Sequence, residues 1–461
     1  MAGRYKPYPK YKDSGIEWLG EIPAHWPISP LKYLCSFSGG GTPSKDRPEY
    51  WSGDIPWVSP KDMKSSRITS TIDNVTELAV KQSSTSLVGS GALLMVVRSG
   101  ILQHSIPVAI NDVPVTLNQD MKALRLSSRL NVKYLMYFIS GNQAQLLLEW
   151  SKQGATVESI EQEYLANTIF PAAPIHEQNK IAAFLDHEIA KIDTLIEKQK
   201  QLIQLLKEKR QAVISHAVTK GLSSLNGGPS AKMRDSGVEW LGEVPEHWGV
   251  ASIRRYLLEH RQGYYTTDAY VDEGAKLLRI TDLRELGEIS ITDCPKVTFS
   301  EALKNYFLQE GDVVFARTGG AGSFGVIPLM HEVIAYASYL IRFRFLPEHF
   351  NTNYLRFMFV ADSFQLAVKR NIHGGVTQNI HAEDIKDALV ATPPLSEQLE
   401  IASYLDMQSS KYAVMISKAS SAIELMQERR TALISAAVTG RIDVRDWVAS
   451  PASPTHKEVA A

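Results

Sequence analysis

Two long stretches of the chain, about residues 176–220 and 396–439, contain neither proline nor glycine and carry apolar residues at alternating spacings of four and three. The repeating positions of the first stretch are Leu185, Ile189, Ile192, Ile196, Gln199, Ile203 and Leu206, and those of the second are Leu405, Ser409, Tyr412, Ile416, Ala419, Ile423 and Met426. This spacing is typical of a helix packed in a coiled coil. At 1.5 Å per residue, each predicted helix is on the order of 65 Å long.

The segments before these stretches have a different pattern, rich in glycine, proline and short apolar runs such as Leu93–Val97, Val313–Phe315 and Tyr339–Phe345. Such runs between turn residues predict strand-rich domains. Helical spacing returns in Asn131–Trp150 and Asn351–Arg370, and each of these begins with an asparagine that can cap a helix. We therefore expect α/β modules of the α+β type.

The chain also contains an internal repeat. Asp13–Trp26 (DSGIEWLGEIPAHW) and Asp235–Trp248 (DSGVEWLGEVPEHW) are identical at eleven of fourteen positions, at an offset of 222. Glu208–Thr219 and Glu428–Thr439 repeat at an offset of 220, while the sequences between these anchors diverge. A period this long excludes a solenoid and indicates a duplicated half-protein, in which a shared frame surrounds a varied module.

Frame, modules and helices divide the chain into eight expected segments. They are an N-terminal frame segment at 1–26, the first module at 27–175, a central long helix at 176–221, a linker at 222–234, the repeated frame segment at 235–248, the second module at 249–395, a C-terminal long helix at 396–441 and a flexible tail at 442–461. Two equivalent helices in one chain can pair antiparallel. The predicted fold is therefore two pseudo-symmetric modules joined by two long antiparallel coiled-coil helices.

Two different modules related by a pseudo-twofold axis suit a target whose own backbone is dyadic, and duplex DNA is such a polymer. Because the modules differ in sequence, they would read different half-sites. The expected target is therefore bipartite and asymmetric, with a spacer set by the length of the helices.

The amino-acid composition says little about the function of the protein. The 461 residues are 44% hydrophobic and 21% charged, with a formal net charge of −1, which neither indicates nor excludes a nucleic acid partner. Cys35 and Cys294 have no second ligand at metal spacing, which fits a reducing cytosol and argues against a zinc ribbon. No apolar run approaches the roughly 20 residues of a membrane span. We expect a cytoplasmic protein with no membrane partner.

Several motifs resemble the target recognition domains of type I restriction–modification specificity subunits. These motifs are Gly39–Ser44 (GGGTPS), Tyr50–Trp57 (YWSGDIPW), Val58–Met63 (VSPKDM), Leu117–Met121 (LNQDM) and Gly311–Gly319 (GDVVFARTG). Three repeated segments of this chain resemble the shared regions that frame those domains in the family. They are Asp13–Trp26, Pro174–Asp186 and Pro394–Asp406. The resemblance covers essentially the whole chain, including the duplication.

The resemblance implies a non-catalytic subunit that binds a split sequence in double-stranded DNA. Such a subunit carries two methyltransferase (M) subunits and, with added restriction and translocase (R) subunits, directs cleavage of unmodified DNA. In the family the recognition domains are α/β units joined by two antiparallel helices. No cofactor is expected in this chain, since S-adenosylmethionine, ATP and Mg belong to the partner subunits.

Candidate DNA contacts are side chains that reach base edges or phosphates, because Arg and Lys pair with guanine and Asn and Gln with adenine. In the first module they are Ser44, Lys45, Ser59, Lys61, Arg98, Gln119, Lys152 and Thr156. In the second they are Arg279, Thr281, Arg317, Thr318, Tyr339, Thr377 and Gln378. Two Gly-Thr loops, at 154–156 and 374–377, recur shortly before each module ends. A one-residue shift superposes Arg98 on Arg317.

Each of these readings has a structural alternative. Arg98 and Arg317 could instead be buried ion-pairing residues, and the glycines could simply form tight turns. Trp51 and Trp57 could stack on an extruded base, but in a strand-rich module we predict that they belong to the core. Frame tryptophans at 18, 26, 240 and 248 would pack the entry to each module or meet a partner. The basic groups at Lys207, Lys209, Arg210, Arg429 and Arg430 are better explained by a solvated helix face than by phosphate contacts.

Enzyme signatures are weak. Phe37–Gly41 spells F-x-G-x-G, but no Asn/Asp-Pro-Pro-aromatic tetrad follows it and the second half lacks the glycines. Asp54 with Asp62-Met-Lys64 faintly resembles a nuclease metal site, and chance explains it better. No G-x-x-x-x-G-K-[ST] phosphate loop occurs. We predict that this chain is not the catalyst. A stand-alone methyltransferase or nuclease, and a coiled-coil scaffold with two protein-binding modules, are the alternatives.

Overall fold

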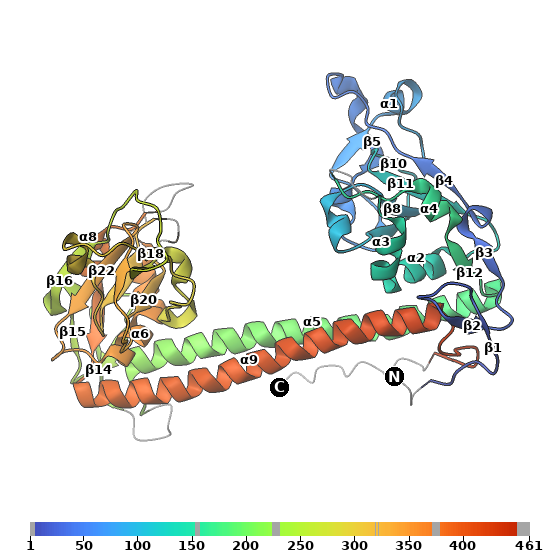
Figure 1. The fold of residues 1–461 in the computed structure, drawn as a ribbon. Helices are drawn as coiled ribbons and strands as arrows, with labels where there is room; N and C mark the ends of the chain where they lie inside the picture. Colours follow the sequence, from blue (N-terminus) through green and yellow to red (C-terminus); the bar gives the residue numbers. More distant parts are fainter. Residues whose placement is uncertain are drawn as a thin grey trace. The chain divides into compact units, whose positions relative to one another are not determined.

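The computed structural model describes residues 5–152, 157–223, 231–318, 320, 322–370 and 379–449. The chain divides into two compact units: unit 1 is residues 1–199 with 421–461, and unit 2 is residues 200–420. Two long helices, α5 (Ile175–Lys220) and α9 (Leu395–Val438), each contribute to both units (Figure 1). Each unit is described by itself.

Unit 1 is built on a five-stranded sheet in the order β4-β11-β8-β9-β6. The strands are β4 (Cys35–Gly39), β6 (Arg67–Ile68), β8 (Leu93–Val96), β9 (Val108–Asn111) and β11 (Met121–Leu126). β11 runs antiparallel to both β4 and β8. All four β8 residues are buried, because a central strand covered on both faces carries a continuous apolar run.

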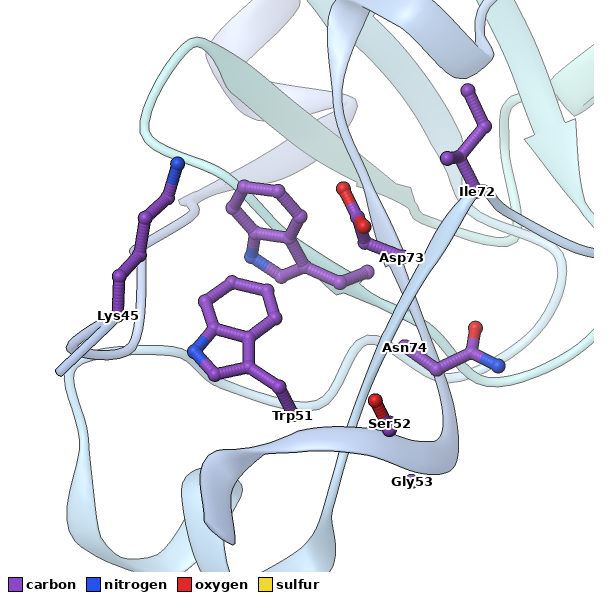
Figure 2. A pocket seen from close by; sticks show the side chains of 8 residues that line it. Lys45, Trp51, Ser52, Gly53, Ile72, Asp73 and Asn74 are labelled. Atoms are coloured by element: carbon purple, nitrogen blue, oxygen red, sulfur yellow. The ribbon is translucent and has the colours of Figure 1, made fainter. Parts of the chain in front are cut away.

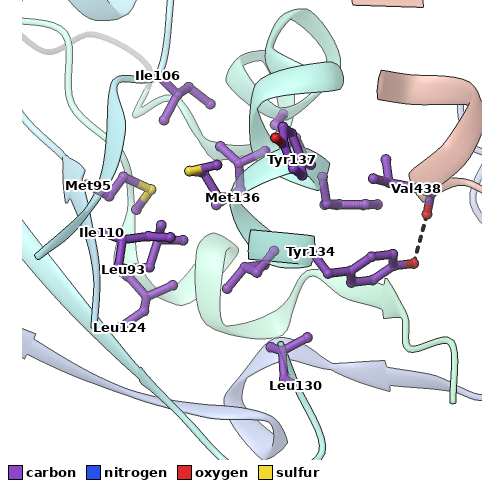
Figure 3. Packing of buried hydrophobic residues seen from close by; sticks show 14 of the residues in the cluster. Leu93, Met95, Ile106, Ile110, Leu124, Leu130, Tyr134, Met136, Tyr137 and Val438 are labelled. Atoms are coloured by element: carbon purple, nitrogen blue, oxygen red, sulfur yellow. Dashed lines mark hydrogen bonds between the residues drawn. The ribbon is translucent and has the colours of Figure 1, made fainter. Parts of the chain in front are cut away.

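Helices α2 (Val132–Gly141), α3 (Gln143–Trp150) and α4 (Gln162–Asn167) complete the core of this module. Figure 3 shows side chains of α2 meeting those of the sheet, and the Tyr134 hydroxyl donating a hydrogen bond to the Val438 carbonyl (2.9 Å). As predicted, Asn131 caps α2, since its side chain accepts from the Tyr134 N–H (3.0 Å).

A smaller sheet of unit 1, in the order β10-β5-β7, lies at the end of the module away from α5 (Figure 1). It consists of β5 (Trp51–Val58), β7 (Asp73–Val75) and β10 (Thr116–Leu117), and helix α1 (Glu77–Gln82) packs beside it. Tyr50, Trp57, Val75 and Ala79 form a separate small core here.

Unit 2 repeats this plan with sheets in the orders β16-β22-β19-β20 and β18-β17-β21. The strands are β16 (Leu257–Gln262), β17 (Ala275–Leu278), β18 (Lys296–Val297), β19 (Val313–Ala316), β20 (Phe324–Val326), β21 (Ile334–Tyr336) and β22 (Leu340–Phe345). Its helices are α6 (Thr352–Val360), α7 (Asp362–Lys369) and α8 (Ala382–Lys386). Asn351 caps α6 as Asn131 caps α2, by accepting from the Tyr354 N–H (3.1 Å).

Two short strand pairs occur at the same places in each unit, one within the frame and one within the module. In unit 1 these are β1 (Tyr11–Asp13) with β2 (Glu21–Pro23) and β3 (Ile28–Pro30) with β12 (Ile169–Pro171). In unit 2 they are β13 (Met233–Asp235) with β14 (Glu243–Pro245) and β15 (Gly249–Ser252) with β23 (Leu389–Thr392). The β3–β12 and β15–β23 pairs join the start of each module to its end.

A Glu-Gln pair at the start of each long helix holds the frame and the module together. In unit 1 the Glu177 carboxylate accepts hydrogen bonds from the indole N–H of Trp26 (3.1 Å) and the hydroxyl of Tyr8 (3.1 Å), and it lies 2.6 Å from His25 Nε2. The Gln178 side chain donates to the Ala173 carbonyl and accepts from the Asn131 N–H (2.8 Å).

The same arrangement occurs in unit 2. The Glu397 carboxylate lies 2.6 Å from His247 Nε2 and accepts from the Trp248 indole (2.9 Å), and Gln398 accepts from the Asn351 N–H (2.9 Å). Trp26 and Trp248 are both buried, which confirms their predicted packing role at the entry to each module.

The predicted coiled-coil seam is confirmed within each unit. Leu185, Ile189, Ile192 and Ile196 of α5 are buried in the unit 1 core, which also contains Leu433–Val438 residues from the end of α9. In unit 2 the start of α9 shares a core with the end of α5, through Ile401, Ala402 and Leu405 with Ile214, Ala217 and Val218. The helices therefore run antiparallel in both units.

Three residues of the basic groups on these helices form ion pairs. Lys207 and Arg210 pair with Glu285, and Arg430 pairs with Asp193 (3.0 Å).

No helix in the described part of the chain is both long enough and apolar enough to cross a membrane.

We predict that Glu177→Ala lowers the free energy of unfolding of unit 1 by about 2–3 kcal/mol, because it leaves the buried Trp26 N–H without an acceptor. Glu397→Ala is the matched control. Its carboxylate is 34% exposed against 4% for Glu177, so water can replace it, and we expect a loss of about 1 kcal/mol. Urea unfolding followed by tryptophan fluorescence measures both; an equal loss at the two positions would contradict the argument.

Candidate nucleic-acid interface

Five connecting segments meet at one end of the strands in each unit, and we call this surface the loop edge. In unit 1 it comprises residues 40–45, 59–64, 98–100, 118–120 and 157–160 with Lys152; in unit 2 it comprises residues 263–270, 279–282, 317–318, 337–339 and 379–380. The segments are joined by backbone hydrogen bonds, so the strands determine where they lie.

Equivalent backbone bonds occur in both loop edges. In unit 1 the N–H groups of Gly41, Asn118 and Val97 donate to the carbonyls of Leu117, Val58 and Asp120 at 2.8, 2.9 and 2.8 Å. In unit 2 the N–H groups of Tyr264, Ala337 and Arg317 donate to the carbonyls of Tyr336, Leu278 and Tyr339 at 2.8, 2.9 and 2.8 Å. The two modules therefore share one backbone framework under different side chains.

A glycine is required where the first segment crosses the strands. A Cβ on Gly40 would lie 2.0 Å from the Asn118 carbonyl oxygen, and a Cβ on Gly263 would lie 2.0 Å from the Ala337 carbonyl oxygen. Our expectation that the second half lacks the glycines altogether is wrong at this position, since Gly263 is the counterpart of Gly40. The close approach of another backbone segment explains why both units have a glycine at this place. The glycine therefore does not indicate a cofactor-binding loop.

Six candidate side chains of unit 1 are exposed on or beside the loop edge: Ser44, Lys45, Lys61, Arg98, Gln119 and Lys152. Arg98 is 53% exposed and its Nε donates to the Asp120 carboxylate (2.7 Å). Gln119 contacts the Thr42 hydroxyl, and Lys152 Nζ lies 3.6 Å from Glu161. These contacts orient the side chains along the surface while leaving them accessible.

Ser59 differs from these residues because it is buried. Its hydroxyl donates to Asp62 (2.7 Å), whose carboxylate also accepts from the Ser59 N–H (2.8 Å). Arg279 holds the same place in unit 2, where Asp282 accepts from its N–H (2.8 Å) and from its guanidinium (3.1 Å). Both residues therefore stabilise a turn, and the hydrogen bonds that the Arg279 guanidinium donates to Asp282 raise its pKa.

In unit 2 two adjoining pockets of about 710 and 620 Å³ bring together the five described candidates. Arg317 and Thr318 line the first pocket, Arg279 and Thr281 line the second, and Tyr339 lines both. Among the residues that the structure describes, the Arg317 guanidinium has no hydrogen-bond or ion-pair partner. The alternative that Arg98 and Arg317 are buried ion-pairing residues therefore fails for Arg317, which has no ion pair among the described residues, and holds for Arg98 only in part, since Arg98 is ion-paired with Asp120 but exposed.

Sequence reasoning missed three tyrosines of this surface. Tyr264 and Tyr265 line both pockets and Tyr270 lines the second, and the last two are 73% and 59% exposed. Exposed aromatic rings beside arginines are suited to stacking on bases. Their clustering after Gly263 in QGYYTTDAY was the available signal.

The superposition of Arg98 on Arg317 is also wrong. Strand pairing aligns Val96 with Ala316, because Val96 pairs with Met121 and Ala316 with Leu340. Arg98 then forms a bridge with Ser159 where Thr318 forms one with Asn379. Arg98 therefore corresponds to Thr318 and Arg317 to Val97. Since successive residues of an extended chain point to opposite sides, the two arginines leave the framework in different directions.

Thr156, Thr377 and Gln378 lie outside the described residues, as do the Gly-Thr loops. Trp57 is buried, which confirms its predicted place in the core, whereas Trp51 is only half-buried and packs against that core. Cys35 and Cys294 are free and buried, and burial raises the pKa of each thiol to about 12. Within the described ranges, no group of His, Cys, Asp and Glu side chains is placed to hold a metal ion.

The chain matches the family described as the type I restriction modification DNA specificity domain at residues 23–205 and 277–419. It is 40% identical over 188 residues to the EcoR124I/EcoR124II specificity subunit of Escherichia coli, a match covering 40% of this chain and 43% of that protein. It is 31% identical over 193 residues to the MjaIX specificity subunit of Methanocaldococcus jannaschii, covering 41% and 43%. Each match thus spans less than half of the relative.

A longer match, 26% identical over 417 residues, covers 87% of this chain and 85% of the EcoKI specificity subunit of Escherichia coli K12. Among solved structures, the fold is similar to a chain of a type I R-M system studied for complex assembly and conformational transition, with a TM-score of 0.65 at 15% identity over 91% of this chain and 99% of the other. It also resembles the HsdS subunit from Thermoanaerobacter tengcongensis, with a TM-score of 0.50 at 14% identity over 91% and 98%. These likenesses show the fold.

We predict that Gly40→Ala destabilises unit 1 by about 1–3 kcal/mol, because the added methyl group collides with a backbone oxygen that cannot move without breaking the strand ends apart. Gly39→Ala is the control, since a Cβ there meets nothing within 4 Å. Chemical denaturation of the two variants tests the difference; comparable stability of both would show that the segment adapts.

Proposed function

Because the chain belongs to the type I restriction–modification DNA specificity family, we propose that it is the DNA sequence-specificity subunit of a type I complex. Each module binds one half of a bipartite site in double-stranded DNA, and the long helices determine the spacer. The chain itself is non-catalytic.

One observation carries the proposal: the same loop edge occurs twice, with different side chains on a shared backbone framework. Where unit 1 has Arg98 and Asp120, unit 2 has Thr318 and Tyr339. A duplicated framework of this kind keeps the approach to DNA constant and lets the base contacts vary. It therefore favours two readers of different half-sites over two copies of one enzyme site.

The candidate side chains divide by chemistry. Arg98, Gln119 and Arg317 carry the paired donors or acceptors that read base edges in the major groove. Lys45, Lys61 and Lys152 are exposed cations suited to phosphates, which position the protein without reading sequence. Ser59 and Arg279 are excluded from the base readers because their polar groups are used within turns.

Partner subunits would supply the chemistry. We propose that two methyltransferase subunits dock along the long helices and the frame, that restriction and translocase subunits join through them, and that S-adenosylmethionine, ATP and Mg are bound there. Large apolar side chains exposed on the helices support such a surface. They include Leu195, Leu202 and Leu205 on α5 and Val414, Met415 and Leu425 on α9.

The direct test is to co-express the chain with a methyltransferase subunit, taken from a neighbouring gene if there is one, and to sequence the adenine methylation left on host DNA. We expect a split motif with a fixed spacer, because two modules read one site. An unmodified genome, given a soluble and intact complex, would contradict the proposal and favour a protein scaffold.

We predict that Arg317→Ala weakens binding to the cognate duplex by about 1–3 kcal/mol and relaxes one position of one half-site. Its stability should change by less than about 0.5 kcal/mol, since the guanidinium has no partner among the described residues. Lys61→Ala, the matched variant, should weaken binding to all sequences alike and reduce the salt dependence. Affinity measured against cognate and altered duplexes at two salt concentrations separates these outcomes; an unchanged motif after Arg317→Ala would remove it from the readers.

A further inference from the structure

Unit 1 contains a pocket of about 570 Å³ between β5 and β7, beside the loop edge. The side chains that matter for its chemistry are Lys45, Trp51, Trp57, Asp73 and Asn74. Figure 2 shows Lys45 on one side of the Trp51 indole and Asp73 and Asn74 on the other. A flat aromatic surface thus lies between a cation and two polar groups.

Both indoles are held in place by the first segment of the loop edge. Trp51 Nε1 donates to the Ser44 carbonyl and Trp57 Nε1 to the Gly41 carbonyl, both at 3.1 Å. The two ring centroids are 5.2 Å apart with an interplanar angle of 86°. Trp57 is anchored in the small core, whereas Trp51 is half-buried and leaves part of its ring open to the pocket. The aromatic surface is therefore preorganised, and ligand binding need not order it.

The backbone beside Trp51 is shaped in an unusual way. Ser52 has a φ of +60°, a left-handed conformation that non-glycine residues rarely adopt, and the pairing of β5 with β7 shifts register between Trp51 and Ile55. Gly53 follows, where a Cβ would lie 2.4 Å from the Val75 carbonyl oxygen. Bulges of this type re-aim side chains next to functional sites. Here the irregularity places Trp51 at the wall of the pocket.

The two charged side chains of the pocket lack internal partners among the described residues. Among the residues that the structure describes, neither the Asp73 carboxylate nor Lys45 Nζ makes a side-chain hydrogen bond or ion pair. The Thr71 hydroxyl donates to the Asp73 carbonyl (2.7 Å) and lies 3.1 Å from Asn74 Oδ1, so the Asn74 amide N–H groups face away from this contact and remain for a ligand. A carboxylate acceptor and an amide donor beside an aromatic face match the hydrogen-bonding edge and the plane of a nucleobase.

We propose that this pocket binds a single nucleobase that carries an exocyclic amino group. The base stacks on Trp51, the Asp73 carboxylate accepts a hydrogen bond from the amino group, and Lys45 contacts the phosphate of the same nucleotide. Among the described residues of unit 2 the indole pair is not repeated, since Leu277 stands in the β17 register position of Trp57. The inference rests on the proposed function only for the source of the base, which is either a base extruded from bound DNA or a free nucleotide.

The test is a titration of the full chain with deoxyadenosine and thymidine 5′-monophosphates, followed by tryptophan fluorescence and by calorimetry. We expect saturable quenching by the adenine nucleotide and at least ten-fold weaker binding of the thymine nucleotide. Asp73→Asn should reverse or abolish this preference, because an amide offers a donor to the thymine carbonyl. It keeps the size of the side chain and breaks no internal hydrogen bond, so its fold should be unchanged. Trp51→Ala should abolish saturable binding.

Asp54→Asn is the matched control, because Asp54 is an exposed residue of β5 outside the pocket, and we expect it to bind like the unchanged chain. Absence of saturable binding, or equal base preference in the unchanged chain and Asp73→Asn, would overturn the proposal. Added cognate duplex distinguishes the sources: displacement of the bound nucleotide supports an extruded base, and retention beside bound duplex supports a free nucleotide. Failure of the proposed function appears separately, as the absence of salt-dependent duplex binding.

Discussion

Each module is fastened to both long helices by a few buried hydrogen bonds, and the rest of the structure depends on them. In unit 1, Glu177 and Gln178 at the start of α5 hold the frame tryptophan and the cap of α2, while the Tyr134 hydroxyl reaches the Val438 carbonyl at the end of α9. In unit 2 the start of α9 and the end of α5 exchange these roles, with Tyr354 bonding to the Val218 carbonyl (3.4 Å). Burial holds the pKa of both tyrosines well above its ordinary value, so the hydroxyls remain donors.

This exchange of roles explains why the two halves of the sequence share the same frame segments and the same residues at the ends of the long helices. A buried glutamate, glutamine or tryptophan whose partner is lost leaves another polar group unsatisfied, so these residues must be kept together. The antiparallel pairing of α5 with α9 follows from the same contacts, because each module binds the beginning of one helix and the end of the other. The constant part of the chain is therefore a framework, and the modules can vary wherever a residue faces outward from it.

The two loop edges differ in their side chains. Strand register keeps the backbone hydrogen bonds of the two edges equivalent, so substitutions such as Asp120 against Tyr339 change the surface without changing its support. The aromatic pocket at Trp51 and the exposed tyrosines at 265 and 270 are the clearest differences between the units. The two modules therefore present chemically different surfaces, as the proposed binding of two different half-sites requires.

The sequence by itself determined the duplication, the two long helices with their seam, the α/β modules and the asparagine caps. These features depend on local periodicity and on identity between the halves, which a single chain displays directly. Its candidate side chains that the structure describes all lie on the loop edges, because glycines, lysines and arginines cluster between apolar runs. Only the tertiary structure decided which of these residues are equivalent and which are available. Arg98 aligns with Thr318 because strand pairing sets the register. The similarity of the short sequences around Arg98 and Arg317 carries no information about that pairing. The polar groups of Ser59 and Arg279 are held within turns because each donates to a carboxylate three residues later. The Trp51 pocket depends on a register shift and on the contact of Gly53 with Val75, and contacts between separate strands leave no periodic trace in the sequence.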